Sequence, residues 1–365
     1  MDEDAECEDE LDERAWPSAL VEADEVRDWI SSALPGQPEV VGPLLVHQAK
    51  EWGVTASFAA AGPQAREVIF KAATHHLFTA APRVHDLLSR HCAGAVPELL
   101  AWAEPRPGQT WSLFAAFEGQ TVEALRTREA LVELARAFAR IQVQVASLPA
   151  TELGGLPRTT LDAIPDHFNA VLRDLRERQQ PLWRGRAREL ALQFHLTNDV
   201  VERLAAYCAQ VRSWTDELLD SALPESIDHV DLHWDNAVVQ PDGNILIYDW
   251  EEAIVGCPLF SLDRLLNDAR ELDLGEEAAW SGEMHGIGLT PSEQALRDAY
   301  LEALPWGTLE RRVRAFDLAL CLAPVKTAYE SIAFADALGW GSEPSLGAAW
   351  AVSRMLARWS APASR

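Results

Sequence analysis

Four polar residues stand at intervals that suit one kind of chemistry: His229, Asp231, Asn236 and Asp249. The first three fit the spacing H-x-D-x-x-x-x-N, and the fourth follows a pair of short apolar runs. Phosphoryl transfer needs a carboxylate that orients the attacking hydroxyl and accepts its proton, a task that suits Asp231. It also needs magnesium, a hard cation that takes carboxylate and amide oxygens, which suits Asn236 and Asp249. The spacing therefore indicates a site for phosphoryl transfer.

A predicted hairpin carries the last of these residues. Residues 237–240 and 245–248 are apolar runs on either side of Pro-Asp-Gly-Asn, a strong turn signal. A carboxylate at the end of an apolar strand is costly to bury unless it meets a cation or hydrogen-bond donors. A polar hairpin that only caps strands is the alternative. The coincidence of motif, spacing and turn favours the chemical interpretation.

The stretch His229-Val-Asp-Leu-His-Trp-Asp-Asn236, followed by Ile-Tyr-Asp249-Trp, resembles the aminoglycoside phosphotransferase and choline kinase family. It is less similar to protein kinases, which usually have lysine where this chain has His233 and D-F-G where it has Asp-Trp-Glu. The resemblance implies an α+β, two-lobed, protein-kinase-like fold. A small antiparallel-sheet N-lobe, residues 16–117, would bind the nucleotide. A larger, mostly helical C-lobe, residues 118–365, would hold the catalytic and substrate-binding residues.

The resemblance also assigns roles outside the catalytic motif. It implies that Lys71, inside the apolar run Val-Ile-Phe-Lys-Ala-Ala, points at the phosphates of ATP. Taken alone, such a lysine could instead be a snorkelling edge residue. Asp263 would be the structural acid that follows the metal-binding aspartate, while His229 and His233 would hold the catalytic loop by hydrogen bonds. The hinge between the lobes, where backbone would meet the adenine, would be Phe114, Ala115, Ala116 and Phe117; a plain buried strand is an equal alternative there.

In the family, the lysine pairs with a glutamate on the N-lobe helix. Here Asp86 is the only acid between Lys71 and Val96. A helix that begins near residue 83 places Asp86 opposite its apolar stripe, so this side chain should face water. The loop at residues 50–56 has a single glycine, and Val230 stands where the family usually has glycine.

Two functions follow from these observations. The first is a kinase that uses ATP (or GTP) and Mg²⁺ to phosphorylate a hydroxyl group of a small molecule, such as an aminoglycoside or another metabolite. The alternative is a nucleotide- or ligand-binding pseudokinase without turnover, which the missing helix glutamate and the reduced loop leave open.

The remaining elements follow from hydrophobic periodicity and turn signals. Strands are predicted at residues 40–46, 54–60, 67–72, 96–102 and 111–117. Helices are predicted at residues 18–33, 83–92, 128–148, 198–222, 291–304, 309–338 and 347–359. Thr290-Pro-Ser-Glu293 predicts the start of the helix at 291, because it combines a capping box with proline at the first helical position.

Composition limits the classes of partner. The net charge of −26 argues against binding to nucleic acid or to an anionic membrane. Five scattered cysteines, with no C-x-x-C pair, indicate a reducing compartment, and no apolar run suggests a membrane span. The acidic start of the chain, residues 1–15, predicts a disordered tail and no signal peptide. A cytoplasmic protein, monomeric or homodimeric, is expected.

One acidic segment leaves two interpretations open. Asp268 and Glu271 lie three residues apart and share a helix face. They would either form a negative rim that favours a cationic substrate or belong to a solvated helix face, and charge runs favour the second.

Overall fold

The computed structural model describes residues 24–34, 39–50, 52–61, 66–73, 75–177, 199–281, 285–286, 288–338 and 343–360. The predicted acidic tail lies outside these residues. The chain forms two compact units. The first comprises the chain up to Gly119 together with Gln240–Glu252, and the second comprises Gln120–Val239 together with the chain from Ala253. Lys71 and Asp249 therefore belong to one unit, and Asp231 belongs to the other.

An antiparallel sheet forms the first unit. Among the described residues its five strands pair in the order β1-β2-β3-β5-β4. Their bounds are Glu39–Lys50 (β1), Gly53–Ala61 (β2), Arg66–Ala73 (β3), Leu99–Ala103 (β4) and Thr110–Ala115 (β5). In β3, Val68, Phe70 and Ala72 are buried. Because side chains alternate along a strand, Lys71 projects from the opposite face of the sheet.

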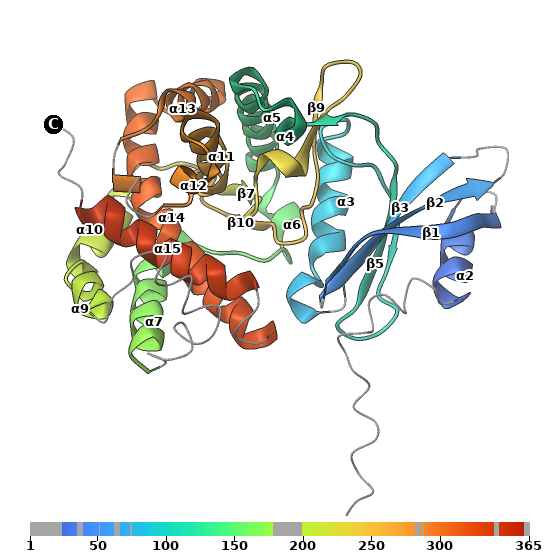
Figure 1. Ribbon diagram of the computed structural model, residues 1–365, viewed down its shortest axis with the longest axis horizontal. Coiled ribbons are helices and arrows are strands. Elements are labelled where there is room, and N and C mark those ends of the chain that lie inside the picture. Colours follow the sequence, from blue (N-terminus) through green and yellow to red (C-terminus); the bar gives the residue numbers. More distant parts are fainter. Residues whose placement is uncertain are drawn as a thin grey trace, which may run out of the picture. The chain divides into compact units, whose positions relative to one another are not determined.

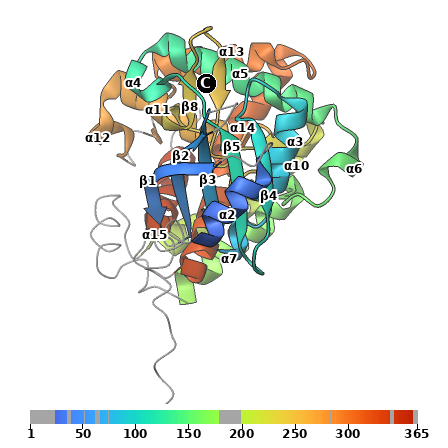
Figure 2. The same cartoon turned by 90° about the vertical axis from the view of Figure 1, so that its right-hand side faces the viewer.

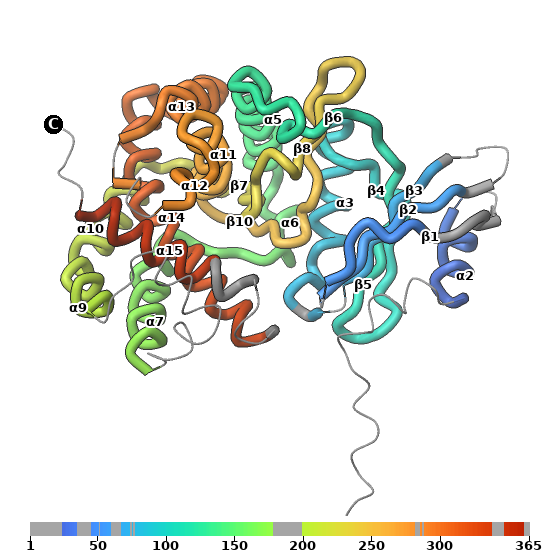
Figure 3. The backbone as a smooth tube through the Cα atoms, viewed as in Figure 1, coloured from blue at the N-terminus to red at the C-terminus, as the bar shows by residue number. Residues whose placement is uncertain are grey.

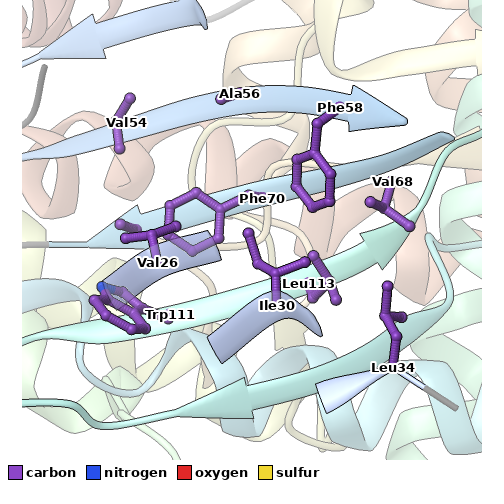
Figure 4. Close-up of a cluster of buried hydrophobic side chains, with 11 residues drawn as sticks. Val26, Ile30, Leu34, Val54, Ala56, Phe58, Val68, Phe70, Trp111 and Leu113 are labelled. Atoms are coloured by element: carbon purple, nitrogen blue, oxygen red, sulfur yellow. The ribbon is translucent and has the colours of Figure 1, made fainter. Parts of the chain in front are cut away.

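Helix α2, Asp24–Ala33, covers the first of these faces, as Figure 2 shows. Val26 and Ile30, four residues apart on the helix, are fully buried. They pack against Phe70 and other apolar side chains of the sheet, drawn in Figure 4. Trp29 completes this core, with its ring centroid 5.5 Å from that of Trp111. The amphipathic stripe that predicts the helix is thus the surface that attaches it to the sheet.

Helix α3, Ala81–His91, lies against the face that carries Lys71. It follows the short 3₁₀ helix η1, His76–Phe78, and contacts β4 and β5. Phe114 of β5 pairs directly with Ile69 of β3, so its side chain shares the face of Lys71. The ring of His85 on α3 meets that of Phe114 edge to face, with centroids 4.7 Å apart. The predicted helix is confirmed.

The segment Gln240–Glu252 also belongs to the first unit. The Gln240 amide donates to the Asn244 carbonyl across the predicted turn, and Gly243 takes the left-handed φ of +85° that this turn requires. Strand β9, Ile245–Ile247, follows. The Ile247 amide donates to the carbonyl of Ala95 over 2.9 Å, which joins this segment to the residues after α3.

Helices dominate the second unit (Figure 1). Its short strands are β6 (Gln120–Thr121), β7 (Ser226–Asp228), β8 (Ala237–Val239) and β10 (Ile254–Gly256), and β6 pairs with β8 while β7 pairs with β10. Its helices before the catalytic loop are α4 (Val122–Leu125), α5 (Arg128–Ala146), α6 (Ala150–Leu153), η2 (Leu161–Ala163), α7 (Ile164–Glu177), α9 (Val200–Ala205) and α10 (Cys208–Asp220). The later ones are η4 (Trp234–Asn236), α11 (Leu262–Leu274), α12 (Glu276–Ala279), α13 (Pro291–Ala303), α14 (Leu309–Leu338) and α15 (Glu343–Ser360).

Two helices position the strands of the catalytic loop. Helix α5 contacts β7 and buries Gln142, whose amide nitrogen donates to the backbone carbonyls of Ile227 and Pro258. Tyr300 of α13 donates to the Gln142 side-chain oxygen. The predicted capping box at Thr290 and Glu293 is present and begins α13. Polar contacts between helices and backbone thus fix the start of the loop.

The single helix predicted at residues 198–222 is instead two helices, α9 and α10. The Tyr207 amide donates to the Leu204 carbonyl, a tight three-residue bond that ends α9. The Tyr207 hydroxyl donates to the backbone carbonyl of Trp359, and the two rings pack at 5.1 Å. This tertiary anchor, which local periodicity does not reveal, interrupts the helix.

Helix α14 corrects one expectation from the sequence. The stretch Leu309–Ala337 is long and apolar enough to cross a membrane by length and composition. Within the second unit α14 packs against α15, which runs beside it in Figure 3, and against α7. Burial in the unit accounts for the apolar side chains, as in the core helix of a bundle.

Candidate active site

Lys71 makes two ion pairs within the first unit. Its Nζ lies 2.5 Å from Oδ1 of Asp249 and 2.7 Å from Oε1 of Glu251. Burial by itself lowers the pKa of Lys71, but both carboxylates outweigh this effect and raise the pKa above its ordinary value. Lys71 is therefore a fixed cation at neutral pH. Its side chain points at these two carboxylates and is not a snorkelling residue at a strand edge.

Asp249 sits where the backbone turns sharply after β9. Its φ of +66° is left-handed, which is uncommon for a residue other than glycine. The following residue, Trp250, is completely buried and donates its indole N–H to the Ile247 carbonyl over 2.8 Å. This anchor fixes the turn and directs the Asp249 carboxylate to Lys71, the kind of partner that the sequence predicts.

The two acids beside Lys71 have pKa values shifted in opposite directions. Burial raises the pKa of Asp249 to about 6, the Glu251 charge adds to this shift, and Lys71 opposes it. Burial also acts to raise the pKa of Glu251, but Lys71 and His85 hold it well below its usual value. The sequence does not single out Glu251 or His85; the acid at the third position of Asp249-Trp-Glu251 is the available signal.

The predicted hinge residues end strand β5 and follow it. Phe114 is buried, and the rings of Phe117 and Tyr248 pack with centroids 5.3 Å apart. The amide of Ala115 donates to the Glu98 carbonyl, and the amide of Ala116 donates to the Glu67 carbonyl. Both amides therefore already donate to backbone carbonyls of neighbouring chain segments in the first unit. A contact of this segment with adenine stays a prediction.

Asp86 behaves as its helical position predicts. Its side chain is 46% exposed and pairs with Arg90, one turn later on α3. No acid on the described helix α3 faces Lys71. The helix instead presents His85 to that face of the sheet.

In the second unit, buried polar groups hold the start of the catalytic loop. Ser261 donates its hydroxyl to Oδ1 of Asp228 over 2.6 Å and accepts the amide of His229 over 3.0 Å. His229 is fully buried, and its ring lies edge-on to Phe138. Lys326 neutralises Asp228 at 3.1 Å. The loop thus begins from a rigid base.

Asp231 projects from this base with 42% of its side chain exposed. His233 Nε2 lies 3.5 Å from one carboxylate oxygen, and Arg264 Nε lies 3.7 Å from the other. Burial acts to raise the pKa of Asp231, but His233 and Arg264 hold the pKa below its ordinary value. Arg264 is itself fixed over the ring of Trp280, 5.0 Å from its centroid. Asp231 is therefore an ionised, oriented carboxylate that a hydroxyl group can reach.

Asn236 closes the loop. Its amide nitrogen donates to the backbone carbonyl of Asp231 over 2.9 Å. The amide oxygen is consequently the atom that this side chain can offer to a hard cation. Asn236 therefore fits a magnesium ligand, as does the half-exposed carboxylate of Asp249 in the first unit.

The acidic segment after Asp263 contradicts both of its interpretations. Asp268 is buried and accepts the amide of Trp234 in the catalytic loop over 2.8 Å. Burial raises the pKa of Asp268 to about 7. Glu271, only 11% exposed, pairs with Arg126 at 2.7 Å. These two acids form neither an acidic rim nor a solvated face, because Asp268 is buried against the catalytic loop and Glu271 is paired with Arg126.

Val230 has a strained backbone conformation, at the position where the family resemblance implies glycine. Its φ of +69° is a conformation that branched side chains rarely adopt. The Val230 amide donates to Oδ1 of Asp228 over 3.0 Å, which holds the backbone in place.

Replacing Val230 with glycine should raise the free energy of unfolding by about 1 kcal/mol. Glycine removes a left-handed strain of about 1–2 kcal/mol, and the greater conformational entropy of the unfolded chain offsets part of this gain. Urea denaturation measures this change, and a loss of stability would contradict it.

Comparisons with solved structures find kinase-like proteins. The chain is 18% identical, with a TM-score of 0.55, to a thermostable mutant of aminoglycoside phosphotransferase APH(4)-Ia in ternary complex with AMP-PNP and hygromycin B, covering 94% of this chain and 100% of that one. It is 17% identical, with a TM-score of 0.57, to a choline/ethanolamine kinase family protein from Mesorhizobium loti, covering 93% of this chain and 95% of that one. It is 17% identical, with a TM-score of 0.54, to a macrolide 2'-phosphotransferase type I, covering 90% of this chain and 96% of that one. These likenesses confirm the predicted fold class.

Sequence comparison gives the family. The model of the phosphotransferase enzyme family matches residues 51–303, which is more than half of the chain. The chain belongs to this family, as its catalytic motif predicts. A search of curated proteins finds no significant match.

Proposed function

We propose that the protein transfers the γ-phosphoryl group of ATP, with magnesium, to a hydroxyl group of a small molecule. The observation that carries the proposal is Asp231, an ionised and partly exposed carboxylate held between His233 and Arg264. In phosphoryl transfer, a carboxylate of this kind orients the acceptor hydroxyl and takes its proton. Membership of the phosphotransferase family supports the same reaction class.

The other residues take complementary roles. ATP supplies the phosphoryl group, and magnesium neutralises charge on the phosphates. Lys71, a fixed cation, holds phosphate oxygens, while Asn236 and Asp249 offer oxygen ligands to magnesium. His233 keeps the Asp231 carboxylate oriented, and burial of the loop start keeps Asp231 in place.

The substrate class follows from the relatives as a set of candidates. Related structures include an aminoglycoside phosphotransferase with hygromycin B, an ethanolamine kinase and a macrolide phosphotransferase. We therefore propose a panel of hydroxyl compounds that spans aminoglycosides, amino alcohols and macrolides. The pseudokinase alternative rests on the missing helix glutamate and on the reduced loop at residues 50–56. Glu251 gives Lys71 a carboxylate partner, which answers the first of these observations.

The proposal predicts nucleotide binding and turnover. Magnesium with ATP, or with GTP if that is the donor, should stabilise the protein by about 2.7 kcal/mol at a hundredfold excess over Kd. A thermal shift assay with and without EDTA measures this effect, and mass spectrometry of the panel detects a phosphorylated product. Stabilisation without any product would favour the pseudokinase alternative. The absence of both stabilisation and product would contradict the proposal.

A further inference from the structure

Lys71 needs a fixed partner to act on a phosphate. A lysine side chain has a flexible four-carbon stem, and a free one loses much rotamer entropy when it is ordered by a ligand. The carboxylates of Asp249 and Glu251 hold its ammonium group in the protein alone. They differ in surroundings, and this difference decides which of them can stay bound to Lys71.

Asp249 is the more accessible partner. Its side chain is 40% exposed, against 19% for Glu251. Under the proposed function Asp249 also serves magnesium, so its oxygens are shared between the metal and Lys71. Glu251 is the carboxylate that is enclosed beside the lysine.

His85 encloses Glu251 from helix α3. The imidazole is buried, with 4% of its side chain exposed, and Phe114 fixes its ring plane. Nε2 of His85 lies 3.5 Å from Oε1 of Glu251, the same oxygen that accepts from Lys71. This separation suits an electrostatic contact and is long for a hydrogen bond. Among the described residues, Nε2 of His85 has no hydrogen-bond partner, so Oε1 of Glu251 is the charged oxygen recorded beside it.

We propose that Glu251, supported by His85, is the positioning residue for Lys71 in this chain. The pair takes the place of the helix glutamate expected from the family, with the carboxylate supplied from Asp-Trp-Glu and the helix supplying an imidazole behind it. The assignment of Lys71 to phosphate binding rests on the proposed function. The Lys71–Glu251–His85 arrangement itself rests on the contacts within the first unit.

A binding experiment tests the role toward nucleotide. Glu251→Gln keeps the shape of the side chain and removes its charge, so affinity for AMP-PNP, measured by calorimetry, should fall about tenfold, the loss expected for a charge-assisted hydrogen bond. The loss should persist for ADP in EDTA, because the lysine contact needs no metal. A loss that disappears without magnesium would make Glu251 a metal ligand only and would overturn the proposal.

A rescue variant separates positioning from general damage. In the Glu251→Gln background, His85→Glu returns a carboxylate to the helix that faces Lys71, and affinity should recover most of the loss. Asp86→Asn, on the same helix but exposed and paired with Arg90, is the matched control and should bind as the unchanged protein does. A folded double variant that shows no recovery would contradict the proposal.

A second readout needs no nucleotide. The rate at which an amine-acylating reagent labels Lys71, followed by peptide mass spectrometry, should rise in Glu251→Gln and in His85→Phe, which keeps the ring on Phe114 but removes the nitrogen. Unchanged labelling in both variants would overturn the proposal. If the unchanged protein binds no nucleotide, the proposed function fails, and labelling alone decides the arrangement around Lys71.

Discussion

Replacing Asp231 with asparagine should lower kcat by about 10²–10⁴-fold, the range that a positioned general base contributes. Asparagine has nearly the same shape and keeps a hydrogen-bonding oxygen near His233, but it cannot accept the proton of a hydroxyl group. The pKa of Asp231 lies below its ordinary value, so the unchanged protein already holds the base form at neutral pH. Nucleotide affinity should change little, because Asp231 is assigned to the acceptor.

Steady-state kinetics with the best compound of the panel measures this loss, together with calorimetry for the nucleotide. Asp216→Asn is the matched control, since it makes the same chemical change on an exposed position of α10. An Asp231→Asn protein that keeps more than about a tenth of the control's kcat would remove Asp231 as the base.

Local patterns in the sequence were sufficient for the fold and for the catalytic motif. Alternation of apolar residues predicts the strands around Lys71, and the structure has them in one antiparallel sheet. The turn at Pro241-Asp-Gly-Asn244 and the capping box at Thr290 are likewise local, because their hydrogen bonds join residues close in the chain. The fold class follows from the family resemblance carried by the motif from His229 to Asp249, and the comparisons confirm it.

Contacts between distant residues were not predictable in the same way. The Lys71–Glu251 pair joins residues 180 positions apart, and no periodicity indicates which acid meets the lysine. The sequence gives no signal for the role of His85, because its partner Glu251 comes from another segment. The sequence correctly indicates that α3 has no glutamate facing Lys71. That absence alone does not show that Glu251, from another segment, supplies the carboxylate.

Charge patterns were the least reliable guide. Asp268 and Glu271 read as a solvated or rim-forming face, but one caps the catalytic loop at Trp234 and the other pairs with Arg126. A charged residue on a helix is usually exposed, so burial of these acids depends on donors that only the tertiary structure supplies. Val230 is similar: its left-handed φ follows from the buried Asp228 that accepts its amide.

Asp263, the structural acid implied by the family resemblance, lies at the centre of a buried ion cluster. Arg354, which has no exposed surface, donates both terminal nitrogens to its carboxylate. Arg358 donates to the same carboxylate over 2.9 Å. Burial acts to raise the pKa of Asp263, but the two arginines hold it below its ordinary value. The cluster joins α11 to α15 and so connects the region after the catalytic loop to the last helix of the unit.

Replacing Asp263 with alanine should destabilise the protein by about 3–5 kcal/mol, because it leaves the Arg354 charge buried without its counterion. Urea denaturation followed by tryptophan fluorescence measures the change. Glu217→Ala provides the control, since its pair with Arg314 is exposed and the loss of this pair should cost at most about 1 kcal/mol of stability.

If the loss in Asp263→Ala comes from an uncompensated charge, Arg354→Met in the same background should recover part of it, since methionine keeps apolar volume and brings no charge. Equal costs for Asp263→Ala and Glu217→Ala, or a further loss in the double variant, would show that packing and not charge burial governs this cluster.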